Sequence, residues 1–177
     1  MPTIVTYNAL ISACDKGKQL SQAVELFKVV QRQGLVPDVV TYNTLISVCQ
    51  TSSHVIDLSA DEKGSWPQLA LEIFQAMKQQ GLVPNVVTYS ALVSACEKGR
   101  RPQGAFKVFE TMQRQGVVPN VITYNALISA CEKGKQPERA LELFEAMQQQ
   151  GLVPDVITSS ALISACEKGR QPGRALE

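Results

Sequence analysis

The strongest constraint on this sequence is that it repeats itself. Five copies of one segment carry a threonine at the same place, with separations of 35, 47, 35 and 35 residues: Thr6, Thr41, Thr88, Thr123 and Thr158. A fixed period in this range is typical of arrays in which each unit buries its apolar face against its neighbours. The sequence therefore predicts one continuous, one-dimensional core built from units 4–38, 39–85, 86–120, 121–155 and a shorter unit 156–177.

Each unit has the pattern of two helices. In the fourth unit we expect a first helix over residues 124–133, with Thr123 as its N-cap and Gly134 as a left-handed stop. Pro137 fits the first turn of a second helix of about 14 residues that ends before Gly151. Short loops make successive helices antiparallel neighbours, so the predicted fold is an all-α solenoid with first helices on one surface and second helices on the other.

The second unit carries 12 additional residues, which we place near residues 50–61. Their polar composition predicts a bulging loop or a lengthened first helix at an edge where insertions are tolerated. His54, the only histidine, has no partner for catalysis and is expected to be a solvated loop residue. Trp66, the only tryptophan, is expected to pack where this segment rejoins the second helix.

Composition excludes several classes of function. The 17 basic and 16 acidic residues nearly cancel, so any attraction for an anion must be local. No run of 18 apolar residues occurs, so we expect no membrane span. The five cysteines fall one to a unit without CxxC spacing, which favours small buried side chains over disulfides or metal ligands. They are Cys14, Cys49, Cys96, Cys131 and Cys166.

Catalytic motifs are missing from the sequence. It has no Walker glycine loop, no set of paired metal ligands and no serine or cysteine with a matching histidine. We therefore expect a protein that is not an enzyme and needs no cofactor.

Polar side chains recur where one face of each unit could meet a ligand. A small polar residue follows the threonine by two positions in each copy: Asn8, Asn43, Ser90, Asn125 and Ser160. Four units close on an amide or a carboxylate: Asp38, Asn85, Asn120 and Asp155. Such groups can match the donors and acceptors of a base edge. A branched apolar residue precedes each threonine and could sandwich base faces: Val5, Val40, Val87, Ile122 and Ile157.

Together these features resemble the pentatricopeptide-repeat family. The resemblance rests on the 35-residue period, the V-[VI]-T-Y-[NS] opening, the A-x-x-x-F second helix and the G-[LV]-V-P-[DN] close. It covers the chain apart from the insertion and the short last unit. It implies a right-handed superhelical α-solenoid that binds single-stranded RNA at about one base per repeat.

The resemblance also implies residue roles. The reading pairs would be Asn8 with Asp38 for uracil, Asn43 with Asn85 for cytosine, Ser90 with Asn120 for adenine and Asn125 with Asp155 for uracil. With Ser160 leaning to a purine, the implied preference is 5′-UCAU(A/G)-3′. Lysines near the ends of the first helices would contact phosphates: Lys16, Lys63, Lys98, Lys133 and Lys168. The acids Asp15, Glu97, Glu132 and Glu167 beside them would weaken this positive stripe.

Two other readings remain. A protein-binding scaffold of the tetratricopeptide type shares the two-helix unit, but its Trp-x-x-Leu-Gly opening and 34-residue period are missing. The polar face could also be a solvated surface without a ligand.

The short last unit predicts incomplete cover of Leu162, Ile163 and Cys166, and with it end-to-end self-association or a cut from a longer array. Family members usually work in mitochondria or plastids, although this sequence encodes no such address.

Overall fold

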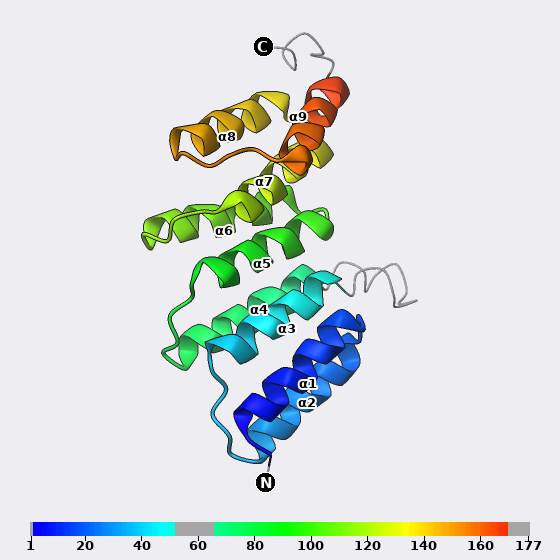
Figure 1. Cartoon of the computed structure of the whole chain (residues 1–177), viewed down its shortest axis with the longest axis vertical. Coiled ribbons are helices and arrows are strands. Elements are labelled where there is room, and N and C mark those ends of the chain that lie inside the picture. The colour runs from blue at the N-terminus through cyan, green and yellow to red at the C-terminus, as the bar shows by residue number, and fades with distance from the viewer. Residues whose placement is uncertain (1, 52–65, 170–177) are drawn as a thin grey trace.

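The computed structural model describes residues 2–51 and 66–169, and every regular element in these ranges is an α-helix (Figure 1). The helices are α1 Ile4–Lys16, α2 Leu20–Arg32, α3 Val39–Thr51, α4 Trp66–Gln79, α5 Val86–Lys98, α6 Pro102–Arg114, α7 Val121–Gly134, α8 Pro137–Gln149 and α9 Val156–Lys168. No described helix is long and apolar enough to cross a membrane.

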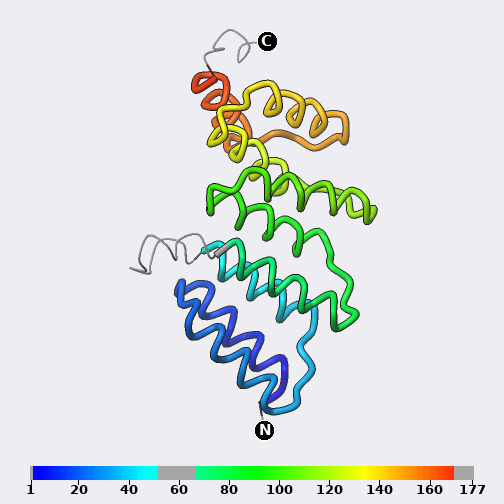
Figure 2. The backbone as a smooth tube through the Cα atoms, turned by 180° about the vertical axis from the view of Figure 1, so that it is seen from behind, coloured from blue at the N-terminus to red at the C-terminus, as the bar shows by residue number. Residues whose placement is uncertain are grey.

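The helices stack in pairs into an elongated solenoid with α1 near one pole and α9 near the other (Figures 1 and 2). In the first four units the first helix packs against its own second helix. Each first helix also packs against the first helices of neighbouring units, so α1, α3, α5, α7 and α9 form a continuous row. The predicted all-α repeat solenoid is confirmed. The predicted insertion falls largely on residues 52–61, which lie outside the described part, as does His54. The side chain of Trp66, whose packing the sequence also predicted, lies outside it as well.

An aromatic contact joins the second helix of each of the first three units to the first helix of the next unit. Phe27 of α2 meets Tyr42 of α3 edge to face at 5.6 Å between ring centroids, and Phe74 meets Tyr89 in the same way. The Phe109 and Tyr124 rings repeat this contact at 6.0 Å. Such pairs contribute about 0.5–1.5 kcal/mol beyond their buried area. In α9 the tyrosine position holds exposed Ser159, so this contact is missing there.

The first helices begin earlier than predicted. Helix α7 starts at Val121 with Asn120 as its N-cap, and the Asn120 side chain accepts from the Thr123 backbone N–H at 3.0 Å. The predicted cap Thr123 is therefore wrong, because this threonine is the third residue of the helix. In α5 and α9 its counterparts, Thr88 and Thr158, complete a capping box with the residue that closes the preceding unit.

Gly134 is not the left-handed stop of α7. It is still helical, and the left-handed residue is Lys135, with φ of 53°. Lys18 and Arg100 hold the same place after α1 and α5, at φ of 54° and 55°.

Two of the glycines that follow first helices, Gly99 and Gly169, instead let units approach closely. A Cβ built on Gly99 would lie 2.2 Å from Pro67 Cγ, and one on Gly169 would lie 2.3 Å from Pro137 Cγ. These prolines belong to the second helices of the preceding units. The glycines are therefore needed for inter-unit packing rather than for a positive φ.

The second helices end as predicted. Helix α8 has 13 residues, close to the expected 14, and begins at Pro137. Gly151 follows it at φ of 72°, and the Leu152 N–H returns to the Met147 carbonyl at 3.1 Å.

All five cysteines are buried and free, as predicted. Burial raises the pKa of Cys49 to about 12 and the pKa of both Cys96 and Cys131 to about 11. These thiols are therefore protonated and unreactive at neutral pH.

The expectation about the last unit is only partly right. Leu162 and Cys166 are buried, because α9 packs against α7 and α8. Ile163 is 53% exposed, whereas Ile128, its counterpart in α7, is fully buried.

Candidate functional site

The structure brings together the four pairs of polar residues that the sequence singled out. The amide nitrogen of Asn8 donates to the Asp38 carboxylate at 3.1 Å, and Asn125 donates to both Asp155 oxygens at 3.1 Å. The Ser90 hydroxyl donates to the Asn120 side-chain carbonyl at 3.1 Å.

The remaining pair, Asn43 and Asn85, shows that the insertion does not disturb this geometry. Asn43 donates to the Asn85 carbonyl at 3.3 Å, although the 12 additional residues lie between them in the sequence. All four pairs are therefore built alike.

A threonine of the next unit locks each pair in place. The Thr88 hydroxyl lies 2.6 Å from the Asn43 carbonyl oxygen and 3.2 Å from that of Asn85, and its backbone N–H donates to Asn85. Thr41 and Thr158 make the same contacts with their pairs. These threonines are completely buried, so they orient the pair without offering a surface of their own. The sequence analysis used them only to find the repeat.

The two carboxylates in these pairs are held in their charged form. The Thr158 backbone N–H is the main cause of a lowered pKa at Asp155, helped by the Thr158 hydroxyl and Asn125. Burial alone would raise the pKa of Asp38, but hydrogen bonds from Thr41 and Asn8 outweigh it, and the pKa falls below its usual value. Both residues are therefore hydrogen-bond acceptors at neutral pH.

The apolar residues expected to sandwich bases form an exposed row beside the pairs. These residues are between 54% and 72% exposed: Val5, Val40, Val87, Ile122 and Ile157. The last four each precede a fully buried threonine, whereas Thr6, which follows Val5, is exposed. A second exposed row, which the sequence analysis missed, lies in the loops before the first helices: Val36, Val83, Val118 and Val153. The repeated V-P dipeptide could have revealed it.

Two of the predicted phosphate-binding lysines are engaged within the protein. Lys133 Nζ lies 2.5 Å from Glu97 Oε1, and Lys168 Nζ lies 2.6 Å from Glu132 Oε1. Each glutamate belongs to the preceding unit, and the Glu97 side chain is only 11% exposed. Both lysines are therefore paired with a carboxylate of the preceding unit and not with the acidic residue beside them in the sequence. Lys16 and Lys98 form no ion pair with any described residue, and Lys63 lies outside that part of the chain.

In the second unit a threonine takes the place of the lysine. The Thr51 hydroxyl donates to Asp15 at 2.7 Å, as Lys133 does to Glu97. A serine one turn earlier completes both clusters, Ser47 to Asp15 at 2.9 Å and Ser129 to Glu97 at 2.7 Å. The same cluster, in which a carboxylate of one unit accepts hydrogen bonds from the next unit, is thus built without a cation at Asp15 and with a cation at Glu97. We call it the inter-unit clamp.

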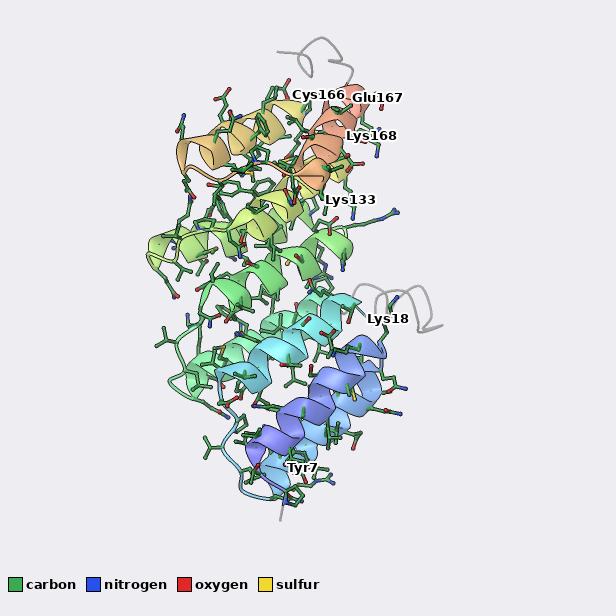
Figure 3. The ribbon with its side chains drawn as sticks, in the orientation of Figure 1. Tyr7, Lys18, Lys133, Cys166, Glu167 and Lys168 are labelled. Carbon is green, nitrogen blue, oxygen red and sulfur yellow. The ribbon has the colours of Figure 1, made fainter. Side chains whose placement is uncertain are left out.

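A hollow of about 500 Å³ lies where the first helices of the last three units end. It is lined by Arg100, Pro102, Glu132, Lys133, Lys135 and Lys168. Figure 3 shows that Lys18, Lys133 and Lys168 lie along one long edge of the solenoid. Four of these six residues are basic and one is acidic, so the wall of the hollow suits an anion. The described residues contain no cluster of three or more potential metal ligands.

Comparison with known proteins places this geometry in context. A family model described as the pentacotripeptide-repeat region of PRORP matches residues 4–175. The maize pentatricopeptide repeat protein PPR10, solved in complex with an 18-nt psaJ RNA element, is similar with a TM-score of 0.81 at 27% identity. That match covers 99% of this chain but only 23% of PPR10.

Two Arabidopsis thaliana structures share the fold at lower identity. The PPR domain of protein-only RNase P 1, in complex with tRNA, has a TM-score of 0.75 at 20% identity, over 95% of this chain and 84% of that domain. Nuclear proteinaceous RNase P 2 has a TM-score of 0.76 at 22% identity, over 97% of this chain and 37% of that protein. A comparison with curated protein sequences gave no match.

Proposed function

Because the chain belongs to the pentatricopeptide-repeat family, we propose that it binds single-stranded RNA and reads about one base with each repeat. The observation that carries this proposal is the repetition of one hydrogen-bonded polar pair, in the same geometry, in four successive repeats. PPR10 and the PPR domain of RNase P 1 were both solved with RNA, which supports the same class of ligand here. The proposed role is that of a binding module without catalysis.

The proposed target is 5′-UCAU(A/G)-3′, read from the amino-terminal repeat onward. The pairs Asn8 with Asp38 and Asn125 with Asp155 would read uracil, Asn43 with Asn85 cytosine, and Ser90 with Asn120 adenine. The row of Val5, Val40, Val87, Ile122 and Ile157 would lie against base faces, which suits its exposure. A preorganised pair favours this assignment, because little side-chain freedom is lost on binding.

Fluorescence anisotropy with short labelled RNAs tests the proposal. One RNA contains 5′-UCAU-3′ and the other 5′-UACU-3′, in the same unstructured flanks, so composition and charge are identical. We expect the first RNA to bind at least about tenfold more tightly, a difference of about 1.4 kcal/mol. Equal affinities would refute the base assignment, and no binding of either RNA at low salt would refute RNA binding itself.

A further inference from the structure

The turns after α1, α5 and α7 each place a basic residue in a backbone conformation that favours glycine. Lys18, Arg100 and Lys135 have φ between 53° and 55°, in the left-handed region. A side chain there costs about 1–2 kcal/mol relative to ordinary helical backbone, which glycine avoids. Glycine does occupy the equivalent turn after every described second helix, for example Gly116 and Gly151. The three exceptions are all cations, which points to a use for their charge.

These cations lie on an edge of the solenoid where positive charge is concentrated. The last turns of the first helices and the turns that follow carry eight described basic residues against four acidic ones, although the whole chain has a net charge of only +1. The basic residues are Lys16, Lys18, Lys98, Arg100, Arg101, Lys133, Lys135 and Lys168, and the acidic ones are Asp15, Glu97, Glu132 and Glu167.

Arg100 and Lys135 also line the hollow of about 500 Å³ between the last three repeats. Glu132 is the one carboxylate in its wall and is already paired with Lys168, while Lys133 is paired with Glu97. Neither Arg100 nor Lys135 forms an ion pair with a described residue. The charges left to attract an anion are therefore those of the two turn residues.

We propose that Arg100 and Lys135, with Lys18 as their counterpart in the first repeat, are the principal contacts of this protein with the phosphates of its RNA. The inference rests on the proposed RNA binding and changes which residues contact the phosphate backbone of the RNA. Lys133 and Lys168 serve mainly to clamp adjacent repeats, and the turn cations bind the strand. The hollow is wide enough for a solvated phosphodiester, and its contacts are independent of base sequence.

Glycine substitutions separate this role from stability. The double variant Arg100→Gly with Lys135→Gly removes two charges and relieves the left-handed backbone. We expect it to bind UCAU and UACU RNAs about three- to tenfold more weakly, by the same factor for both. The slope of log affinity against log salt should fall by about 1.4, as expected for two lost phosphate contacts on a single strand. The urea midpoint of unfolding should stay the same or rise.

Two comparisons complete the experiment. Lys107→Gln with Arg114→Gln removes two exposed charges from α6 and should leave affinity and salt slope unchanged. RNAs with hydroxyl groups at both ends should show the same loss, whereas a loss confined to phosphorylated ends would refute a backbone contact. If the glycine double variant binds RNA with the affinity and salt slope of the wild type, this inference alone is overturned. Failure of the wild type to bind any RNA overturns the proposed function as well.

Discussion

At the scale of single residues, one member of each polar pair also belongs to the start of the helix that follows it. Asp38, Asn85, Asn120 and Asp155 cap the next first helix and at the same time bond to the pair partner. The resemblance to the pentatricopeptide-repeat family implied which residues pair, because the family motif recurs at fixed places in the sequence. It did not predict their capping role, because threonine is also a good cap and stands three residues further on.

Ser90→Asn tests the base assignment in the third repeat. Besides its bond to Asn120, the Ser90 hydroxyl lies 2.9 Å from the Thr123 hydroxyl and donates to the Val86 carbonyl at 2.7 Å. Asparagine fills the same place in the first, second and fourth repeats, so the fold should tolerate it. We expect anisotropy titrations to show the third base preference moving from adenine to cytosine by about tenfold. A uniform loss across RNAs would instead indicate damaged packing.

Asp155→Asn tests the fourth pair and its charge. Asparagine caps α7 in the same way, so the helix should form, while the preferred fourth base should change from uracil to cytosine. The folded-state pKa of Asp155 lies below its usual value, so its charged form stabilises the fold above the unfolded pKa. That contribution is lost as the pH falls through the lower folded pKa.

Circular dichroism melts between pH 5 and pH 2 measure this difference. The melting temperature of the wild type should fall more steeply below about pH 4 than that of Asp155→Asn. Asp38 remains in both proteins and serves as the internal reference. Identical pH profiles would contradict a stabilising charge at Asp155.

At the scale of helices, Gly99 and Gly169, which follow the first helices α5 and α9, have a packing role that the sequence does not reveal. Gly17, Gly99 and Gly134 look like left-handed stops, but each has a negative φ or lies within the helix. The residue that follows each of them takes the positive φ. Only the distance from Gly99 or Gly169 to a proline of the preceding repeat explains the small side chain. This contact joins repeats and is invisible in a local pattern.

Gly99→Ala and Gly134→Ala form a matched pair. The added methyl at Gly99 would overlap Pro67, and we expect a loss of about 1–3 kcal/mol in the free energy of unfolding. At Gly134 the nearest atoms lie 3.7 Å away, so alanine should stabilise the helix by about 0.5–1 kcal/mol. Urea titration measures both values. A similar loss in both variants would exclude the packing explanation.

Glu97→Gln tests the clamp between the third and fourth repeats. The variant keeps an acceptor for Ser129 and Lys133 but removes a mostly buried negative charge. We expect a loss of about 1 kcal/mol in stability, because Lys133 loses its charged partner. RNA affinity at low salt should rise about two- to fivefold, since the edge gains one positive charge. Glu110→Gln, on the exposed face of α6, should change neither quantity.

At the scale of the whole molecule, the fold was predictable because one period fixes the topology. Five equivalent positions, such as Thr41 and Thr88, can be superposed only if the same two-helix unit stacks repeatedly. The left-handed turn cations and the glutamate clamps could not be predicted, because they depend on how close adjacent repeats approach. In a one-dimensional array that distance is set by contacts such as Phe27 with Tyr42, not by local sequence.

Ser159→Tyr tests this view of stability at the last interface. The tyrosine ring would meet Phe144 of α8, as Tyr124 meets Phe109 one repeat earlier. We expect the free energy of unfolding to rise by about 1 kcal/mol, from the aromatic contact and the newly buried area. Thermal and urea unfolding measure the gain, and hydrogen exchange should place it in α8 and α9. Ser160→Tyr, at the neighbouring exposed position, is the control and should give no gain.

The double duty of the closing residues limits what such a molecule could be taught to recognise. If these residues read bases as proposed, any replacement at Asp38, Asn85, Asn120 or Asp155 must still cap the start of a helix. Only the few side chains that can both cap a helix and pair with the preceding residue are therefore usable. Reprogramming by swapping whole units should accordingly succeed where free choice at these sites would unravel the neighbour.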